Sequence, residues 1–522
     1  MADTDVRPTI CCFAAAKHAF FLMSKSISTP SGSETEFKGA LEHRNFHLPL
    51  ESNRREFLKQ SGIGFGLLAV GGMLQTNALS GSLQAASVKA LNPLAPKPPH
   101  ATPKAKSVIF LFMYGGPSQM DTFDYKPQLQ KDHGKPLKSL DKSDVFFGGP
   151  GSLLRSNYSF RQYGESGAWV SELYPHLSSK VDEIAFIKSC TADSNNHGPA
   201  LMEMNTGFTR VGSPSMGSWI TYGLGTENGD MPGYIVMLDK TGGPINGAQN
   251  WSNGFLPGAY QATPFRSTGV PILNLDRAKH HSNESQRRQL NLLNWMNEKH
   301  GEHHPAEADL QARIENYELA FRMQMAAPEI TDITKESAAT QELYGIGEKK
   351  TDYFGRQLLL ARRMVERGVR FVQVYSGGAH GDNNWDQHGN MAHHRRHTVA
   401  TDKPITGLLS DLESRGLLEE TLIVWGGEFG RLPVAQGGKG RDHNPRGFTM
   451  WMAGAGIKGG VSYGATDEYG YRAAENIVTV QDIHATALHQ LGVHHEKLTY
   501  RFQGRDFRLT DVSGNVIHDI LA

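Results

Sequence analysis

Short, continuous apolar runs recur along the chain from about residue 106 onward. Runs without the alternation of a half-buried sheet are typical of strands that are covered on both faces. Segments with helical spacing of apolar residues lie between several of these runs. The predicted strands are Val108–Met113, Ile184–Ile187, Tyr234–Leu238, Val369–Tyr375, Leu422–Trp425 and Phe448–Ala453.

Three segments show the apolar periodicity of helices: Leu310–Met325, Phe354–Arg367 and Ile405–Leu417. Strands and helices that alternate in this way predict an α/β fold, with a mostly parallel sheet covered on both faces by helices. The stretch Gly242–His304 is rich in Gly, Asn, Ser and His and has weak periodicity. We expect it to be an irregular insertion of long loops that controls substrate access.

The composition narrows the class of protein. The chain has 522 residues, of which 39% are hydrophobic, so it is long enough to bury a large core. Lys and Arg number 53, and Asp and Glu also number 53. A formal net charge of zero lacks the positive excess of proteins that track phosphate backbones, so we expect no nucleic acid partner.

The N-terminal part is interpreted as an address. Arg54 and Arg55 precede the apolar, glycine-rich run 63–74 and resemble a twin-arginine export signal, although Asn53 replaces the usual Ser or Thr. The run is shorter than the roughly 20 apolar residues of a membrane span, so we expect no stable transmembrane span in the mature chain. A buried helix is the alternative interpretation.

These features predict three parts. Residues 1–90 form a leader read by the twin-arginine translocation machinery, 91–105 a Pro-rich linker, and 106–522 a single domain in the periplasm or on the cell surface. Cys11 and Cys12 fall in the leader and leave Cys190 alone in the mature chain, which excludes an intramolecular disulfide and a thiolate zinc finger.

Polar residues collect where the predicted strands end. Because the ligand site of an open α/β sheet lies beyond the carboxyl ends of its strands, we expect these side chains to meet at one edge. Carboxylates with imidazoles suit Zn, Mn or Fe, and the sequence does not separate these from Mg or Ca. The candidates are Asp121, Thr191, His197, Asp386, His388, Glu428, Arg431, Arg441 and His443.

Each candidate also has a simpler interpretation. Asp121 could cap a helix, Asp386 and His388 could belong to a solvated loop, and His443 could be part of a surface charge cluster. Glu428 is harder to dismiss, because its glycine neighbours let another group approach closely. The histidines that follow are expected to form an exposed helix face rather than metal ligands; they are His393, His394 and His397.

The succession of motifs is similar to that of the alkaline phosphatase superfamily, which includes sulfatases. It looks closer still to the bacterial family numbered 1501 among domains of unknown function, over about Lys106 to Leu521. The motifs are GGPSQMDTFD at 115–124, NHGPA at 196–200, GGEFGR at 426–431, GRDHNP at 440–445 and LTYRFQGRD at 498–506. The resemblance implies an alkaline phosphatase-like three-layer sandwich.

The resemblance also implies a ligand set for one or two divalent metal ions. Asp121 corresponds to the carboxylate after the first strand, and His443 matches the late histidine. Asp386 and His388 resemble an Asp and His pair, with one intervening residue where the superfamily usually has three. Glu428 stands where the superfamily has Asp, and Phe429 stands where it has a ligating His.

The resemblance leaves the nucleophile open. His197 occupies the position of the modified Cys of sulfatases, and neither that Cys nor its supporting Arg is present. Hydrolysis through formylglycine is therefore disfavoured. His197 could itself be a ligand or a covalent nucleophile; otherwise Thr191 or Ser194 could supply a hydroxyl near a helix N-terminus, where backbone N–H groups favour an anion.

Together these features predict an exported metal-dependent hydrolase that acts on phosphate or sulfate esters of a small molecule or a polysaccharide. Arg431 or Arg441 would hold the anionic group in a bidentate manner. One alternative is an inactive superfamily member that binds sulfated polysaccharide or a cell-surface partner. Another is metal-dependent hydrolysis of an amide or a glycan, because a fold does not fix a reaction.

Overall fold

The computed structural model describes residues 93–522, except 147, 150, 267–271, 273–274, 276–281, 304–307 and 380. The predicted leader, with Arg54 and Arg55, lies outside the described residues. Within the described ranges, no helix is both long enough and apolar enough to cross a membrane.

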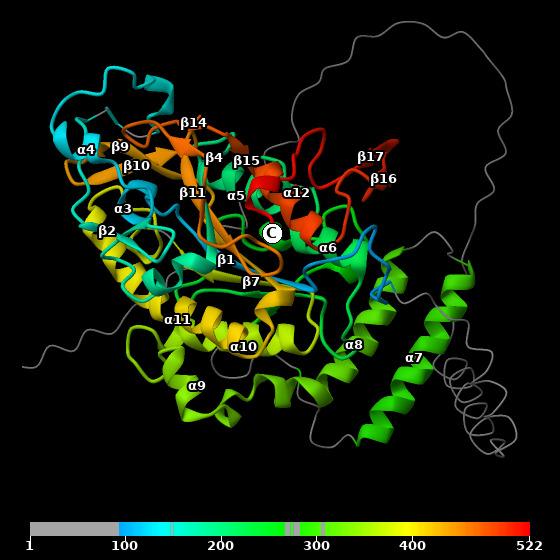
Figure 1. Ribbon diagram of the computed structural model, residues 1–522. Coiled ribbons are helices and arrows are strands. Elements are labelled where there is room, and N and C mark those ends of the chain that lie inside the picture. The colour runs from blue at the N-terminus through cyan, green and yellow to red at the C-terminus, as the bar shows by residue number, and fades with distance from the viewer. Residues whose placement is uncertain are drawn as a thin grey trace, which may run out of the picture. The chain divides into compact units, whose positions relative to one another are not determined.

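A nine-stranded sheet forms the centre of the domain (Figure 1). Its strands are parallel except β11, which runs antiparallel to both of its neighbours. This confirms the predicted mostly parallel sheet. The path is β12 (Val461–Tyr463), β4 (Ile184–Thr191), β11 (Phe448–Ala453), β8 (Thr421–Gly426), β1 (Ser107–Met113), β7 (Phe371–Ser376), β5 (Tyr234–Met237) and β6 (Thr263–Phe265), and β15 (Val478–Thr479) also pairs with β4.

Strand β1 shows why the apolar runs become central strands. All seven of its residues are buried, and successive side chains point to opposite faces of the sheet. Val108, Phe110 and Phe112 enter one hydrophobic core, whereas Ile109 and Leu111 enter the other. A strand with two buried faces needs apolar side chains on both, and the sequence shows them without a break from Val108 to Met113; the buried hydroxyl of Ser107, at the start of the strand, donates to the carbonyl of Val369.

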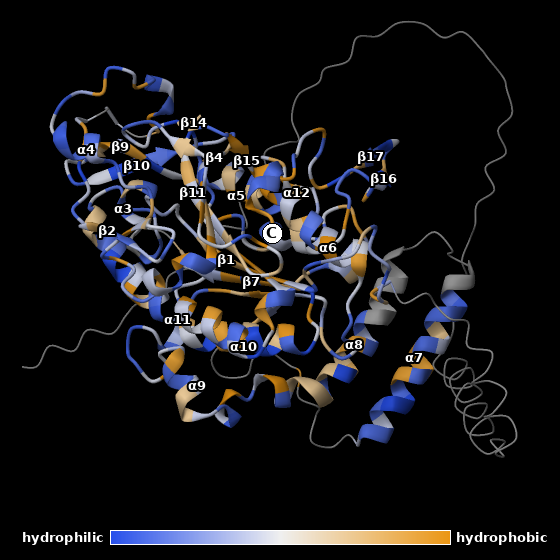
Figure 2. Cartoon of the chain, viewed as in Figure 1, coloured by the Kyte–Doolittle hydropathy of each residue, from blue (hydrophilic) through white to orange (hydrophobic). Residues whose placement is uncertain are grey.

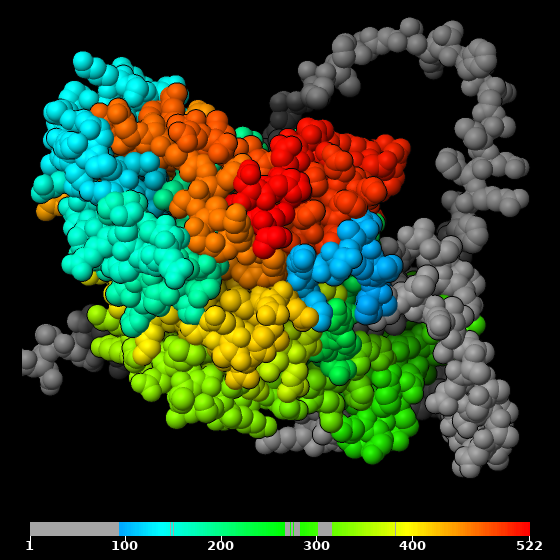
Figure 3. All heavy atoms as spheres, viewed as in Figure 1, coloured from blue at the N-terminus to red at the C-terminus, as the bar shows by residue number. Residues whose placement is uncertain are grey.

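Helices cover both faces of the sheet, as predicted (Figure 1). One core contains side chains of α5, α6 and α12, and the other contains side chains of α8, α10 and α11. Figure 3 shows the yellow to yellow-green segments of the second group on the side opposite the red C-terminal segments. The bounds are α5 (His197–Thr206), α6 (Met216–Leu224), α8 (Ala308–Thr331), α10 (Asp352–Glu366), α11 (His394–Ser414) and α12 (Val480–Gln490).

Two segments differ from the expectation. Helix α7 (Asn283–His303) lies inside the stretch expected to be irregular. Its many Asn, Gln and charged residues hide the helical periodicity, and Figure 2 draws it mostly in the hydrophilic colour. The described part of the Pro-rich linker packs on the domain: the amide of Lys97 donates to Leu224 and that of Ala101 to Gly492.

Smaller elements complete the domain. The hairpin of β9 (Gly430–Gln436) and β10 (Gly440–Asn444) stands outside the main sheet and carries several candidate site residues. A third, small hydrophobic cluster, which includes Leu432 and Val434, supports it. The other short elements are α3 (Gln119–Thr122), α4 (Pro127–Lys131), α9 (Ala338–Leu343), β2 (Phe160–Tyr163), β3 (Ala168–Ser171), β13 (Ala465–Thr466), β14 (Ala473–Glu475), β16 (Tyr500–Phe502) and β17 (Arg505–Phe507).

Candidate metal centre

Four side chains from three parts of the chain converge beyond the carboxyl ends of β4 and β7. His197 is the first residue of α5, Asp386 and His388 belong to the loop after β7, and His443 lies on β10. One ligand atom from each lies within 4.8 Å of the others. Four of the candidate residues therefore lie together at the edge of the sheet where the parallel strands end.

The carboxylate of Asp386 is the centre of this cluster. Its Oδ1 atom lies 2.8 Å from Nε2 of His388 and 3.1 Å from Nε2 of His443. Its Oδ2 atom lies 3.2 Å from Nε2 of His197, which is a buried nitrogen without a hydrogen bond. The Nε2 atoms of His388 and His443 are 2.9 Å apart.

The second nitrogen of each imidazole contacts an oxygen acceptor. Nδ1 of His197 lies 2.6 Å from Oε1 of Glu428, and Nδ1 of His443 lies 2.6 Å from the carbonyl oxygen of Asn195. Nδ1 of His388 contacts Oε1 of Gln436. Because these oxygens accept a hydrogen, each Nδ1 carries an N–H, and each Nε2 presents a lone pair to a metal when its ring is neutral.

This arrangement fits a divalent metal. Three lone pairs that face one another and a carboxylate repel unless a positive charge lies among them. Metal-ligating histidines characteristically donate their other N–H to a carboxylate, a carbonyl or a similar acceptor, as these three do. Three imidazole nitrogens and one carboxylate oxygen suit the coordination of Zn, Mn or Fe.

Electrostatics of the metal-free cluster follow the same logic. Burial raises the pKa of Asp386, but the charge of Arg431 and contacts with the three imidazoles outweigh it and hold that pKa well below its usual range. Burial lowers the pKa of His443 to about 3. Burial also lowers the pKa of His197, but the Asp386 and Glu428 carboxylates raise it to about 9. Without a metal, a proton on His197 thus supplies positive charge.

Glu428 holds His197 from behind rather than joining the cluster. Its side chain is fully buried, and both of its oxygens accept from the amide of Gly115, at 3.0 and 3.2 Å. Gly115 has a φ of +109°, and a Cβ there would lie 2.6 Å from the amide nitrogen of Asp386. A glycine is needed at this position because the loop that carries Asp386 passes so close.

Phe429 forms an apolar wall of the cluster. Its ring is stacked on that of His443, with centroids 4.6 Å apart, and its centroid lies 4.8 Å from that of His197. It occupies the position where the resemblance implies a ligating histidine. The sequence analysis gives His197 a catalytic role and leaves a ligand role open. In the structure, the imidazole of His197 is part of the cluster, whereas position 429 contributes no imidazole.

Asp121 and the two arginines lie under the cluster in a buried polar layer. Asp121 Oδ2 pairs with Nε of Arg441 at 2.9 Å and accepts from Ser118 Oγ at 2.6 Å. Arg431 contacts Asp386 at 2.7 Å and also donates to the carbonyls of Gly115 and Gly116. The metal role of Asp121 and the anion role of the arginines stay predictions.

Thr191 ends β4, and its hydroxyl donates to the carbonyl of Val478 at 3.2 Å. The nucleophile role of Thr191 also stays a prediction.

One sequence interpretation is wrong. His394 is fully buried, and His397 is 8% exposed, so the two do not form an exposed helix face. His394 accepts from the amide of Ser118, and both rings pack against Trp385. The two histidines are buried because the loop that precedes Asp386 packs against this part of α11.

A family profile described as "Protein of unknown function (DUF1501)" matches residues 105–521. The chain belongs to this family. The match covers the whole cluster and nearly all of the described residues. No curated protein sequence matches the chain significantly.

Distant overlaps with solved structures include three enzymes of bacterial origin. A lipoteichoic acid synthase from Listeria monocytogenes shares 9% identity over 80% of this chain and 79% of its own, with a TM-score of 0.34. A sulfatase from Pseudoalteromonas sp. shares 14% identity over 75% and 68%, with a TM-score of 0.31. An alkaline phosphatase from the Antarctic bacterium TAB5 shares 11% over 70% and 95%, with a TM-score of 0.29. Nothing about the chemistry of the DUF1501 chain follows from overlaps this distant.

Sequence reasoning missed two groups that orient the imidazoles. They are Gln436, which contacts His388, and the carbonyl of Asn195, which contacts His443. Gln436 lies 48 positions from His388 in the sequence, and a glutamine near the end of a hairpin strand carries no signal of that contact. Asn195 contributes a backbone atom, which no residue type reveals.

Proposed function

We propose that this DUF1501 protein is a metal-dependent hydrolase that acts on phosphate or sulfate esters. The observation that supports the proposal most strongly is the convergence of three Nε2 atoms on the carboxylate of Asp386, with every Nδ1 held by an oxygen acceptor. Burying three imidazole nitrogens around a carboxylate costs free energy unless the group binds a cation.

His197, Asp386, His388 and His443 would hold the metal. A divalent ion in such a site polarises an ester and lowers the pKa of a bound water toward neutrality. The side chain of His388 is 27% exposed and that of Asp386 is 17% exposed, so solvent and a substrate reach the cluster from this side. Glu428, Gln436 and Asn195 fix the orientation of the three rings.

Water is the nucleophile that we propose. The hydroxyl of Thr191 is committed to the carbonyl of Val478, and His197 is held between Glu428 and Asp386. The buried wall of Phe429 excludes water from one side of the cluster, so that an attacking water enters beside His388.

The test begins with elemental analysis of purified protein. We expect stoichiometric metal in the wild type and in His489→Ala, which removes an exposed histidine outside the cluster, but no metal in His388→Ala. A panel of phosphate and sulfate esters should then show turnover that His388→Ala lacks. A folded wild type that binds no metal from a panel of divalent ions would refute the proposal.

A second candidate is a protein that has lost turnover and binds a sulfated polysaccharide or a cell-surface partner. Phe429 favours this candidate, because it stands where the resemblance implies a ligating histidine. Among the described residues one cluster has the geometry of a metal site, whereas the resemblance implies one or two metal ions. Retained metal without turnover of any ester would support this candidate. Turnover of amides or glycosides, assayed beside the esters, would point instead to metal-dependent hydrolysis of an amide or a glycan.

We also propose that residues 1–90 direct export to the periplasm or the cell surface. Arg54→Lys combined with Arg55→Lys should keep the protein in the cytoplasm. Cell fractionation would measure this, with an Arg-to-Lys pair in the domain, such as Arg501→Lys with Arg505→Lys, as the control. Unchanged export of the leader variant would contradict the proposal.

A further inference from the structure

A cavity of about 700 Å³ opens beside the loop that carries the metal ligands. It lies among the loop after β5, the segment before α10, the loop after β7 and the first turns of α11. The lining residues on which the argument rests are Lys240, Lys349, Lys350, Tyr353, Arg395 and Arg396.

The rim of this cavity is strongly positive. Lys240, Lys349, Lys350, Arg395 and Arg396 are all exposed. Among them, Arg395 pairs with an acidic residue, Glu172, and the other four have no carboxylate partner within the described residues. The one carboxylate among the described lining residues is Asp239, which accepts from the amides of Thr241 and Gly377. In a chain of zero net charge, such an excess is local and marks a site for an anion.

The floor of the cavity is largely apolar. Tyr353 and Val399 contribute to it, and the hydroxyl of Tyr353 donates to the carbonyl of Leu238 at 3.0 Å, which holds the ring in place. An apolar floor under a charged rim suits a ring that carries anionic substituents: the face of the ring packs on the floor while its charges reach the rim.

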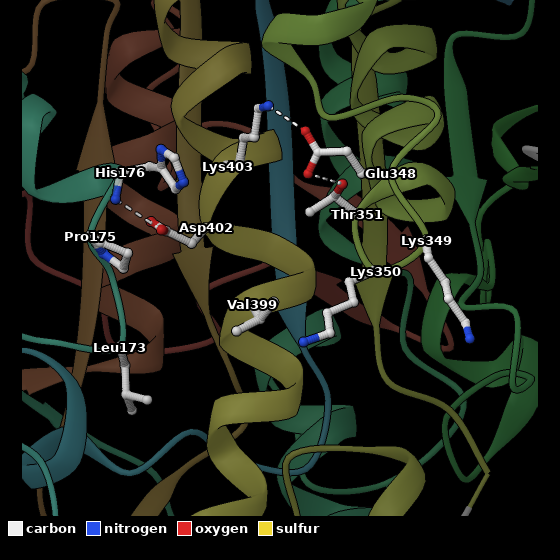
Figure 4. A pocket seen from close by; sticks show the side chains of 10 residues that line it. All are labelled: Leu173, Pro175, His176, Glu348, Lys349, Lys350, Thr351, Val399, Asp402 and Lys403. Atoms are coloured by element: carbon white, nitrogen blue, oxygen red, sulfur yellow. Dashed lines mark hydrogen bonds and ion pairs between the residues drawn. The ribbon is translucent and has the colours of Figure 1, made fainter.

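A second hollow continues the first along α11. It has a volume of about 260 Å³ and shares Lys349, Lys350 and Val399 with the larger cavity. Figure 4 shows the side chain of Lys350 extending toward Val399 on α11, with Lys403 farther along the same helix, where it pairs with Glu348, and with His176 on the loop that also carries Pro175. The second hollow adds Lys403, which pairs with Glu348, and the carboxylate of Asp402, so the excess of cations lies at Lys349 and Lys350, where the two hollows meet. Two joined hollows with cations at their junction fit a polymer better than a small ion.

The cavity and the metal cluster share a structural element. Asn383 lines the cavity and precedes the ligand Asp386 by three residues in the sequence. Trp385 is one of the two residues between them. The Trp385 ring packs on His397, with centroids 5.3 Å apart, and its Nε1 donates to Ser376 at 3.3 Å; both partners line the cavity. A chain seated in the hollows would thus run beside the loop that holds the metal ligands.

We infer that these two hollows, the basic groove, bind an anionic polysaccharide, a glycan that carries several sulfate or phosphate ester groups. The inference names the substrate class of the hydrolase, and in this link to catalysis it rests on the proposed function. A single-stranded nucleic acid fits less well, because such sites stack successive bases on several aromatic platforms. Among the described lining residues of the two hollows, Tyr353 and the buried Phe354 are the aromatic side chains other than histidine.

The test compares dextran sulfate with unmodified dextran of the same length on the intact protein. We expect calorimetry to show binding of dextran sulfate that weakens with added salt, and none of dextran. Lys349→Glu combined with Lys350→Glu should weaken binding by about tenfold or more. The matched control, Lys458→Glu combined with Lys497→Glu, reverses two exposed lysines outside the groove and should bind as the wild type does.

Phosphorylated dextran distinguishes the two anionic groups: tighter binding than dextran sulfate assigns the groove to a phosphorylated glycan, and weaker binding assigns it to a sulfated one. Equal loss of binding in the groove and control variants would overturn the inference, because it would show attraction by overall charge. Tighter binding of oligothymidine than of either polymer would overturn it in favour of nucleic acid.

The same variants separate this inference from the proposed function. His388→Ala should lose metal and still bind dextran sulfate, whereas the groove variant should keep its metal. Groove-dependent binding by a protein that never holds metal would leave the groove established and the hydrolase refuted. A protein that binds metal and hydrolyses esters, but shows no groove-dependent binding, would leave the hydrolase established and the groove refuted.

Discussion

Asp386 and Asp121 are two carboxylates at the same edge of the same sheet, and they have different contacts. Each contacts a fully buried arginine, Arg431 or Arg441. Around Asp386 the other neighbours are the Nε2 atoms of three imidazoles. Around Asp121 they are donors: the Ser118 hydroxyl and the Arg441 guanidinium. Both of these donors contact Oδ2 of Asp121, and its Oδ1 is buried without a hydrogen bond, whereas Asp386 contacts imidazole nitrogens through both of its oxygens.

Exposure separates the two carboxylates as well. The side chain of Asp121 is 1% exposed, which leaves no path for a substrate, while Asp386 and His388 reach solvent. The comparison teaches that residue type and position after a strand locate polar groups at the edge. The tertiary structure then decides which side chains each of these groups contacts.

The largest expected effect is the loss of the metal site in Asp386→Ala. The substitution removes the two carboxylate oxygens that the three imidazoles contact. Metal content should therefore fall to background, and ester hydrolysis should vanish. Elemental analysis with circular dichroism as a folding control measures this. Full metal occupancy in a folded Asp386→Ala protein would break the comparison.

Asp121→Asn should act on stability instead. It leaves the Arg441 charge buried without its partner, so the free energy of unfolding should fall by about 3–5 kcal/mol. Metal stoichiometry should stay that of the wild type at temperatures where the variant is folded. Urea denaturation and elemental analysis measure the two quantities. Adding Arg441→Met should recover part of the loss, and a variant that is stable yet metal-free would assign Asp121 to the metal site.

Glu428→Gln sharpens the comparison at an orienting residue. The amide can still contact Nδ1 of His197 but no longer places a negative charge behind the ring, so metal affinity should fall by about tenfold. Competition with a chelator of known affinity measures it. Glu172→Gln, which changes an exposed glutamate that pairs with Arg395, should leave metal affinity unchanged.

The smallest effect is a pH dependence of stability in metal-free protein. The pKa of His197 is raised to about 9, above its ordinary value near 6.5, by Asp386 and Glu428 against the effect of burial. Its contribution to stability is therefore fully present below pH 6.5 and lost as the pH rises through 9. Urea denaturation of chelated protein between pH 6.5 and 9.5 should show this decline.

His443 does not disturb that window, because burial lowers its pKa to about 3 and its effect falls between pH 3 and 6.5. His197→Gln should flatten the decline above pH 6.5, and His443→Gln should leave it in place. A flat profile in the wild type would contradict the pairing of His197 with two carboxylates.

Much of the fold could be predicted because the central strands are buried on both faces. Ile109 and Leu111 on one side of β1 and Phe110 on the other must all be apolar, so the strand appears in the sequence as an unbroken run. Helix α7 was missed for the opposite reason. It buries little of its surface, and a helix with little burial needs no apolar stripe.

The sequence by itself determined the α/β class, the segments that form the buried central strands, and the position of Asp386 and His388 after the end of β7. Local pattern suffices for these, because burial acts on each segment separately. Only the tertiary structure decided that His197 joins them, that Asp121 turns to Arg441, and that His394 is buried. Those outcomes depend on which atoms meet across hundreds of residues, and the pairing of donors with acceptors is a property of that meeting.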